Sequence, residues 1–218
     1  YERLDKLWES DKEGEEESRR LIHCIRDAAS WGCSVVIMHA IIGMQRIAPD
    51  CKDKKRGLRN FQKIFDAAQE AGVVVAMENT EGEEYLDHVF SMFRGHPNVR
   101  FCIDTGHEMC YDYGHDLIGK YADLLFCTHL NDNIGMTGKA ITWMDDLHLL
   151  PFDGVADWEK IASRLKSANY CGDFTYEVKL EGRVGRHEHD AYRAMSFKEY
   201  AQLAFERAKR FQKLFMMQ

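Results

Sequence analysis

The sequence VRFCIDTGHEMC, from Val99 to Cys110, contains an apolar run that ends abruptly in polar residues. The pattern predicts a buried strand that stops at Asp104, then a Thr-Gly turn, and then His107. A carboxylate and an imidazole therefore stand at the end of one predicted strand. In open sheets and barrels of parallel strands, ligands and catalytic groups collect at the carboxyl ends of the strands, because the loops that follow the strands open there.

Three further apolar runs end in an ionisable residue in the same way. VVVAMENTEG has Glu78 at its end, LLFCTHLNDN ends in His129, and DFTYEVKLEG ends in Glu177. With Asp104 these residues form a set of three carboxylates and one imidazole. Such a set suits a divalent ion such as Mn²⁺, Mg²⁺, Co²⁺ or Zn²⁺. For any one of these residues, an ordinary polar residue at the end of a strand is the better interpretation. This alternative becomes less favoured when four such residues occupy the same end of neighbouring strands.

Other ionisable residues are candidates for substrate binding or for an additional metal ion. His107 follows Asp104 by three residues, and His39 ends the first visible strand. Asp146 and His148 form a D-x-H pair in a long loop. Each has a structural alternative, because His107 can cap a helix, His39 can be a structural histidine and a D-x-H pair can occur by chance.

Apolar strands and amphipathic helices alternate along the chain. Residues 1–30 are helical in pattern, and the predicted strands are residues 35–40, 73–79, 99–104, 124–130 and 174–179. The other predicted helices cover about residues 58–71, 82–94, 117–122, 157–165 and 196–215. This alternation predicts an α/β fold with a parallel sheet covered by helices, as a single domain over residues 1–218. Because five strands are too few to close an eight-stranded barrel, either the sheet is open or three βα units precede Tyr1.

The composition is that of a globular protein, with 218 residues, 45% of them hydrophobic, and a formal charge of −7. The negative charge disfavours nucleic acid as a partner, since DNA-binding proteins neutralise phosphates with Lys and Arg. No apolar run approaches the roughly 20 residues that span a bilayer, and the first residues do not resemble a secretory signal. We therefore predict a cytoplasmic protein without a membrane segment, whose seven cysteines are reduced. The stretch GRHEHDAY, with His187 and His189, is predicted to be a solvated loop, and contact of these histidines with the substrate is the less favoured alternative.

The motifs at the strand ends resemble those of the xylose isomerase-like TIM barrels. This superfamily holds sugar and sugar-phosphate isomerases and epimerases together with the endonuclease IV type of AP endonuclease. AMENTEG is similar to the family's metal-glutamate strand, CIDTGHEMCYD to its Asp-x-x-His strand, THLNDN to its metal-histidine strand and YEVK to its closing glutamate strand. The resemblance runs from about Val35 to the C-terminus. It implies a (β/α)8 TIM barrel of which the chain supplies about the last five βα units, with the N-terminal strands missing before Tyr1.

The resemblance also implies roles for single residues. The residues that match the shared metal site are Glu78, Asp104, His129 and Glu177. His107 matches a histidine that contacts substrate in epimerases and binds a further zinc in the endonucleases. His39, Asp146 and His148 match additional endonuclease ligands, although a D-x-H loop also occurs in isomerase-like members. The loop arginine of the ketose epimerases falls near Gly135 here, which leaves the recognition of the sugar open.

The resemblance implies a metal-dependent isomerase or epimerase of a sugar, a sugar phosphate or a related polyol. In this hypothesis Glu78 and Glu177 transfer a proton next to a carbonyl that the metal polarises. One alternative is a multi-zinc phosphodiesterase on abasic DNA, and another is a sugar-binding protein without catalysis. The expected partner is a small-molecule sugar. The identity of the sugar and of the metal, and association into homo-oligomers, stay open.

Overall fold

The computed structural model of the chain describes residues 3–42, 54–112, 114–135 and 142–218. The chain divides into two compact units, Tyr1–Cys102 and Ile103–Gln218. The single domain over residues 1–218 stays a prediction.

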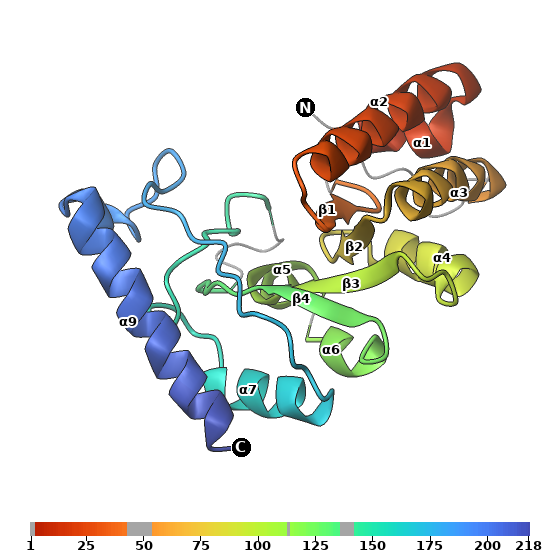
Figure 1. The fold of residues 1–218 in the computed structure, drawn as a ribbon. Coiled ribbons are helices and arrows are strands. Elements are labelled where there is room, and N and C mark those ends of the chain that lie inside the picture. Colours follow the sequence, from red (N-terminus) through yellow and green to blue (C-terminus); the bar gives the residue numbers. More distant parts are fainter. Residues whose placement is uncertain (1–2, 43–53, 113, 136–141) are drawn as a thin grey trace. The chain divides into compact units, whose positions relative to one another are not determined.

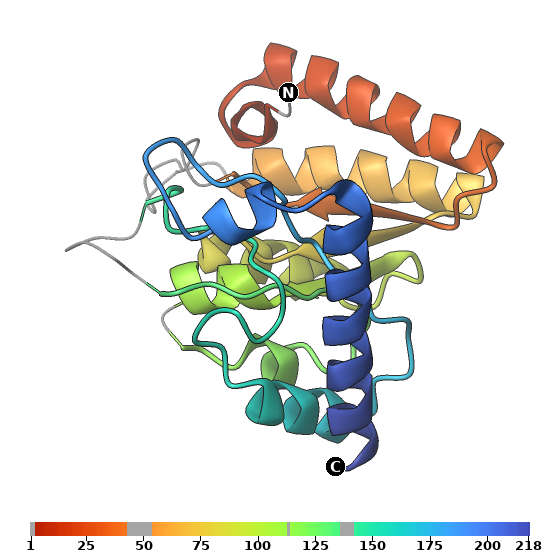
Figure 2. The same ribbon diagram turned by 90° about the vertical axis from the view of Figure 1, so that its left-hand side faces the viewer.

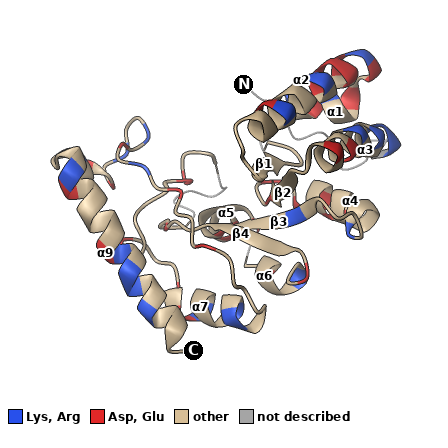
Figure 3. Ribbon diagram, in the orientation of Figure 1, with Lys and Arg blue, Asp and Glu red and all other residues tan. Residues whose placement is uncertain are grey.

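Helices form most of the first unit. They are α1 (Leu4–Glu9), α2 (Asp11–Ser30), α3 (Lys54–Ala71) and α4 (Glu83–Phe93). Ser10 separates α1 from α2, because its side chain accepts a hydrogen bond from the amide of Glu13 over 3.2 Å and so caps the second helix. Helices α2 and α3 lie side by side (Figures 1 and 2). Both carry charges of either sign (Figure 3), and Arg56 on α3 pairs with Asp11 on α2 over 2.8 Å.

Trp8 lies at the centre of the apolar core of the first unit. Its side chain is buried, and its ring packs against Phe61 and Tyr85 at centroid distances of 5.4 and 5.0 Å. The indole Nε1–H donates to the carbonyl of Ala40 over 2.9 Å, so the polar atom of this buried ring is satisfied. The ring lies against the backbone of Gly57, where an added Cβ would stand 2.0 Å from it. Helix α3 can approach this closely only because residue 57 has no side chain.

Three parallel strands complete the first unit and carry two of the predicted residues at their ends. They are β1 (Val35–His39), β2 (Val74–Glu78) and β3 (Val99–Asp104), the last of which continues into the second unit. The register pairs His39 with Glu78, and Glu78 with Cys102. The carboxyl ends of the strands therefore meet at one edge of the sheet, as the sequence predicted. Strands β2 and β3 are almost wholly buried, which explains their unbroken apolar sequences.

The second unit contains one further strand and five helices among its described residues. They are α5 (Thr105–Tyr111), α6 (Leu117–Lys120), β4 (Leu125–His129), α7 (Trp158–Ser167), α8 (Asp190–Arg193) and α9 (Phe197–Met216). Figures 1 and 2 both show α7 beside the carboxyl-terminal half of α9. Trp158 on α7 packs edge-on against Phe211 on α9, with centroids 5.3 Å apart. A separate apolar cluster around Leu149 and Tyr200 supports the loops near the candidate site.

The predicted strand at residues 174–179 is wrong. The segment makes only an isolated parallel bridge, between Tyr176 and Leu130, which follows β4. The amide of Thr175 donates to the hydroxyl of Thr128 over 3.1 Å, where a regular ladder would use a backbone carbonyl. Because a side chain takes this position, the ladder does not continue into a strand. The bridge still holds the segment beside the end of β4.

Two other local predictions also differ from the structure. The Thr-Gly pair after Asp104 forms no turn but starts α5, because the Asp104 carboxylate caps that helix. His189 was predicted to lie in a solvated loop, but it is 1% exposed and its ring lies edge-on to Tyr192. Its neighbour His187 is exposed, as predicted. The six cysteines in the described part of the chain are free thiols.

Within the described ranges, no helix has both the length and the apolar composition needed to cross a membrane.

Candidate functional site

The end of β4 brings His129 and Glu177 into direct contact. The bridge between Leu130 and Tyr176 places these two residues on neighbouring segments, each one position from the bridge. Nδ1 of His129 lies 2.8 Å from Oε2 of Glu177. His129, Glu177 and Asp104 each offer one atom that could bind a metal ion, and these three atoms all lie within 4.8 Å of one another. Two carboxylate oxygens and one imidazole nitrogen at this spacing are suitable ligands for a divalent ion.

Asp104 is fully buried and its orientation is fixed from two sides. Oδ1 accepts the backbone N–H of His107 over 2.7 Å, and Oδ2 accepts the side-chain amide of Asn131 over 2.8 Å. The hydroxyl of Thr105 in turn donates to the carbonyl of Asn131 over 2.8 Å. Gly106 allows this contact, because an added Cβ would stand 1.9 Å from Oδ1 of Asn131. Sequence reasoning missed Asn131, whose only signal is its place two residues after His129.

The first unit carries the two remaining strand-end residues. Glu78 is 3% exposed and ends β2, and His39 ends β1. Nε2 of His39 lies 3.3 Å from Oε2 of Glu78, as their paired register requires. A carboxylate and an imidazole therefore stand together at the edge of this sheet.

The D-x-H pair of the second unit forms a compact cluster with His107. Nε2 of His148 lies 2.8 Å from Oδ2 of Asp146, and Nε2 of His107 lies 3.7 Å from the same oxygen. His148 adopts a left-handed backbone with φ of 53°, which turns its ring back toward Asp146. Nδ1 of His148 also lies 3.0 Å from the carbonyl oxygen of Glu177, so this cluster adjoins the first one. The three residues have suitable spacing for a metal ion of their own.

The charge of Asp146 is stabilised by its neighbours. Burial acts to raise the pKa of this carboxyl, but the hydrogen bond of His148 and the nearby imidazole of His107 outweigh it and hold the pKa far below its usual range. Nη2 of Arg183 donates to the same Oδ2 over 3.1 Å. Asp146 is thus an ionised carboxylate over the whole physiological range.

Two cations that sequence reasoning did not select follow Glu177 along the chain. Arg183 binds the backbone carbonyl of Asp146 through Nε and Nη2, at 3.2 and 3.0 Å, and its guanidinium stands 4.9 Å from the ring of Trp143. Lys179 is half-buried, and burial lowers the pKa of its ammonium group. Both residues occur in the stretch YEVKLEGR, but no pattern in the sequence separated them from ordinary charged residues on the surface.

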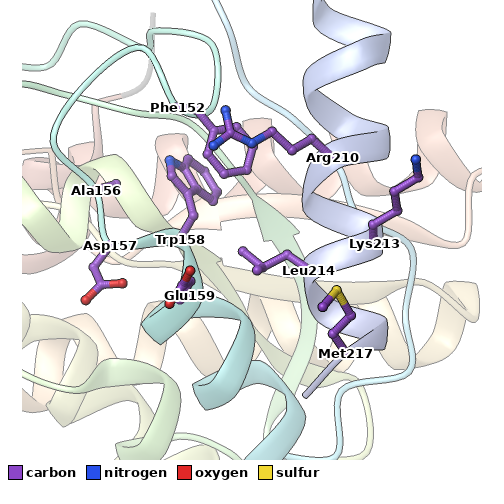
Figure 4. A pocket seen from close by; sticks show the side chains of 9 residues that line it. All are labelled: Phe152, Ala156, Asp157, Trp158, Glu159, Arg210, Lys213, Leu214 and Met217. Atoms are coloured by element: carbon purple, nitrogen blue, oxygen red, sulfur yellow. The ribbon is translucent and has the colours of Figure 1, made fainter.

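Asp132 organises the loop that leads from His129 to α7. Its buried carboxylate accepts the amides of Phe152 and Ala156 over 3.0 and 2.9 Å and the indole N–H of Trp158 over 2.8 Å. A cavity of about 420 Å³ lies between residues of this loop and α9. Figure 4 shows the Arg210 guanidinium over the ring of Phe152 in this cavity. None of the sequence-predicted site residues lines this cavity.

Comparisons with known proteins identify similar sequences and folds. A family model described as xylose isomerase-like TIM barrel matches residues 4–198. The uncharacterized protein y4fM of Sinorhizobium fredii is 29% identical over 132 residues, which are 58% of this chain and 40% of that protein. The chain therefore spans less than half the length of this curated relative.

Two solved structures illustrate the similarity of fold. D-psicose 3-epimerase from Clostridium cellulolyticum H10, solved with D-tagatose, matches with a TM-score of 0.68 at 15% identity, over 97% of this chain and 75% of that chain. IolI protein, solved with a bound zinc atom, matches with a TM-score of 0.70 at 18% identity, over 96% of this chain and 81% of that chain. At these identities the two matches establish a shared fold.

Proposed function

Because the chain belongs to the xylose isomerase-like TIM-barrel family, we propose that it is a metal-dependent isomerase or epimerase of a sugar, a sugar phosphate or a related polyol. The family match confirms the predicted α/β TIM-barrel fold class. Similar solved structures include sugar epimerases, which supports an enzyme of this general kind.

The cluster of Asp104, His129 and Glu177 carries the proposal. Two carboxylates held within 4.8 Å of each other repel unless a positive charge lies between them, and an imidazole nitrogen at the same distance completes a ligand set for Mn²⁺, Mg²⁺, Co²⁺ or Zn²⁺. We assign Glu78 as the fourth ligand. It ends the neighbouring strand and pairs in register with Cys102, two residues before Asp104.

The residues of the chain supply the proton transfer. A divalent ion at this site would polarise the substrate carbonyl and so acidify the adjacent carbon. Of the two glutamates, Glu78 and Glu177, one removes the proton from that carbon and the other returns it. The side chain of Glu177 is 40% exposed, which leaves it accessible to a substrate, and its contact with His129 keeps its carboxylate aimed at the site.

Substitution of Glu177 by glutamine tests this role. The amide keeps the shape of the side chain but cannot accept the proton, so Glu177→Gln should retain part of the metal and lose incorporation of solvent deuterium into the substrate. The exposed Glu181 provides a matched control, since Glu181→Gln changes the same chemical group outside the cluster. The assay is NMR in D2O with ketoses, aldoses and inosose-type polyols. Normal exchange by the Glu177→Gln variant would rule out the assignment.

One observation favours a second candidate function. The buried cluster of His107, Asp146 and His148 has the spacing of an additional metal site, as a multi-zinc phosphodiesterase acting on abasic DNA requires. Arg183 weighs against it, because a guanidinium that binds Oδ2 of Asp146 repels a cation at the same oxygen. The net charge of −7 also disfavours a nucleic acid substrate.

Metal analysis separates these candidates. One ion per chain supports the isomerase, whereas three zinc ions per chain support the nuclease. A sugar-binding protein without catalysis would bind a sugar tightly and show no deuterium exchange at any carbon.

A further inference from the structure

We propose that Asp146 and Arg183 together bind two neighbouring hydroxyl groups of the substrate, at the end away from the carbon on which the reaction takes place. The inference rests on the proposed function, because it concerns the substrate of that same site. It assigns a recognition role to Arg183 and specifies an uncharged, polyhydroxylated end as the part of the substrate that is bound.

The guanidinium of Arg183 is held in a fixed orientation, and the edge that carries Nη1 can be reached by a ligand. Nε and Nη2 donate to Asp146, and the ring of Trp143 lies 4.9 Å from the guanidinium. Nη1 makes no hydrogen bond to any residue that the structure describes. The side chain is 26% exposed, so a ligand can reach this nitrogen. A guanidinium whose orientation is already fixed loses little conformational entropy on binding a ligand.

Asp146 supplies an acceptor beside this donor. Its side chain is 9% exposed, and Oδ1 is buried without a hydrogen-bond partner among the described residues. A buried carboxylate oxygen in this state is costly unless a ligand donates to it. A hydroxyl group both donates and accepts, so neighbouring hydroxyls can satisfy Oδ1 of Asp146 and Nη1 of Arg183 at the same time.

The position of the pair fits the far end of a sugar. Asp146 contacts His148, whose Nδ1 lies 3.8 Å from Oε1 of Glu177, so the pair is separated from Glu177 by one imidazole ring. Arg183 therefore offers its guanidinium beside this end of the substrate rather than at Glu177.

The charges favour an uncharged group over a phosphate. The guanidinium of Arg183 and the carboxylate of Asp146 compensate each other, and a phosphate placed on Nη1 would face the carboxylate. Lys179, the other cation of this region, has the carboxylates of Asp146 and Glu177 close enough to favour its charged form, against the effect of burial. A phosphorylated probe tests whether the site prefers an uncharged group.

The test compares long and short substrates on metal-loaded protein. The probes are the neutral ketohexoses D-fructose, D-tagatose and D-psicose, D-fructose 6-phosphate, and dihydroxyacetone, which has no far hydroxyls. Dissociation constants are measured by calorimetry for the wild type, Arg183→Met, Arg183→Lys and Arg193→Met. Arg193 is an exposed arginine on α8 that has no role in the site and serves as the matched control.

Arg183→Met should weaken binding of the best ketohexose by about 10- to 100-fold, the loss typical of a hydrogen bond to a charged group. Arg183→Lys should recover part of the loss, and binding of dihydroxyacetone should change less than about twofold, which also shows that the variant is folded. The inference would be overturned if Arg183→Met weakened the binding of all probes equally or of none. It would also be overturned if no neutral ketohexose bound the wild type. Tighter binding of D-fructose 6-phosphate than D-fructose, lost in Arg183→Met, would overturn it in favour of a phosphate site. Absence of deuterium exchange together with Arg183-dependent binding would instead refute the proposed function alone.

Discussion

The side-chain amide of Asn131 donates to Oδ2 of Asp104 over 2.8 Å, while Oδ1 of the same carboxylate accepts the amide of His107. Each oxygen of Asp104 therefore accepts a hydrogen bond from a donor in a fixed position. Asn131 lies in the segment that directly follows β4, the strand that ends in His129. One short stretch of chain thus supplies an imidazole and also orients a carboxylate from a different strand.

Removal of this amide should weaken metal binding. Asn131→Ala removes one of the two hydrogen bonds that orient the Asp104 carboxylate, and such a loss typically lowers metal affinity by about 10- to 100-fold. Titration with Mn²⁺ followed by calorimetry measures the change. Asn98→Ala is a suitable control, because it removes an amide hydrogen bond to Val73 in the first unit. Equal affinity in Asn131→Ala and the wild type would mean that Asp104 needs no support from this residue.

Substitution of Asp132 should destabilise the chain more than loss of an ordinary helix cap. The Asp132→Ala variant leaves the amides of Phe152 and Ala156 and the indole of Trp158 without their acceptor. We expect the free energy of unfolding to fall by about 2–4 kcal/mol. Asp157→Ala, which removes only the cap of α7, should cost about 1 kcal/mol. Urea denaturation distinguishes the two values, and similar losses would contradict the role given to Asp132.

The Gly57→Ala substitution should lower the free energy of unfolding, whereas glycine-to-alanine substitutions inside helices usually raise it. Alanine is normally better than glycine inside a helix by about 1 kcal/mol. Here the new Cβ would stand 2.0 Å from the ring of Trp8, so we expect net destabilisation of about 1–3 kcal/mol. Gly95→Ala is the control, since no described atom lies within 4 Å of the added Cβ. A more stable Gly57→Ala variant would show that Trp8 can move aside.

Thiol labelling should discriminate sharply between the cysteines. Burial, with the nearby Asp146 and other carboxylates, raises the pKa of the Cys110 thiol to about 12, so only about one molecule in ten thousand is the reactive thiolate at pH 8. Cys24, Cys33 and Cys171 are exposed. Iodoacetamide followed by peptide mass spectrometry should therefore modify these three and spare Cys110 until urea is added. Rapid modification of Cys110 in the native protein would contradict its described burial.

The predictions that succeeded from sequence depend on short-range regularities. Unbroken apolar runs identified β2 and β3, and the rule that parallel strands end at one edge selected His129 and Glu177 as neighbours. The run at residues 174–179 was apolar enough to read as a strand, yet only Tyr176 pairs there. A hydroxyl from another segment interrupts that ladder, and apolar periodicity carries no information about such a contact.

The residues that sequence reasoning missed lie in loops. Arg183 and Trp143 lie far apart in the chain but meet in the fold, and His148 between them is a non-glycine residue in a left-handed conformation. Asn131 acts through a contact with Asp104 that is 27 residues away in the chain. Neither relation follows from local propensity, since both depend on the folded path of the loops.

Metal binding should stabilise the folded chain in a way that depends on His129. An ion that binds only the native state raises the free energy of unfolding by RT ln(1 + [ion]/Kd), about 2.7 kcal/mol at a hundredfold excess over Kd. His129→Ala removes one of the proposed ligands, so the stabilisation by added Mn²⁺ or Zn²⁺ should largely disappear. His187→Ala changes an exposed histidine and should keep it. Because protons compete with the ion for the imidazole and the carboxylates, the stabilisation should be full near pH 8 and fade as the pH falls through about 6. Thermal unfolding with and without the ion measures these differences, and stabilisation that persists unchanged in His129→Ala would exclude this residue as a ligand.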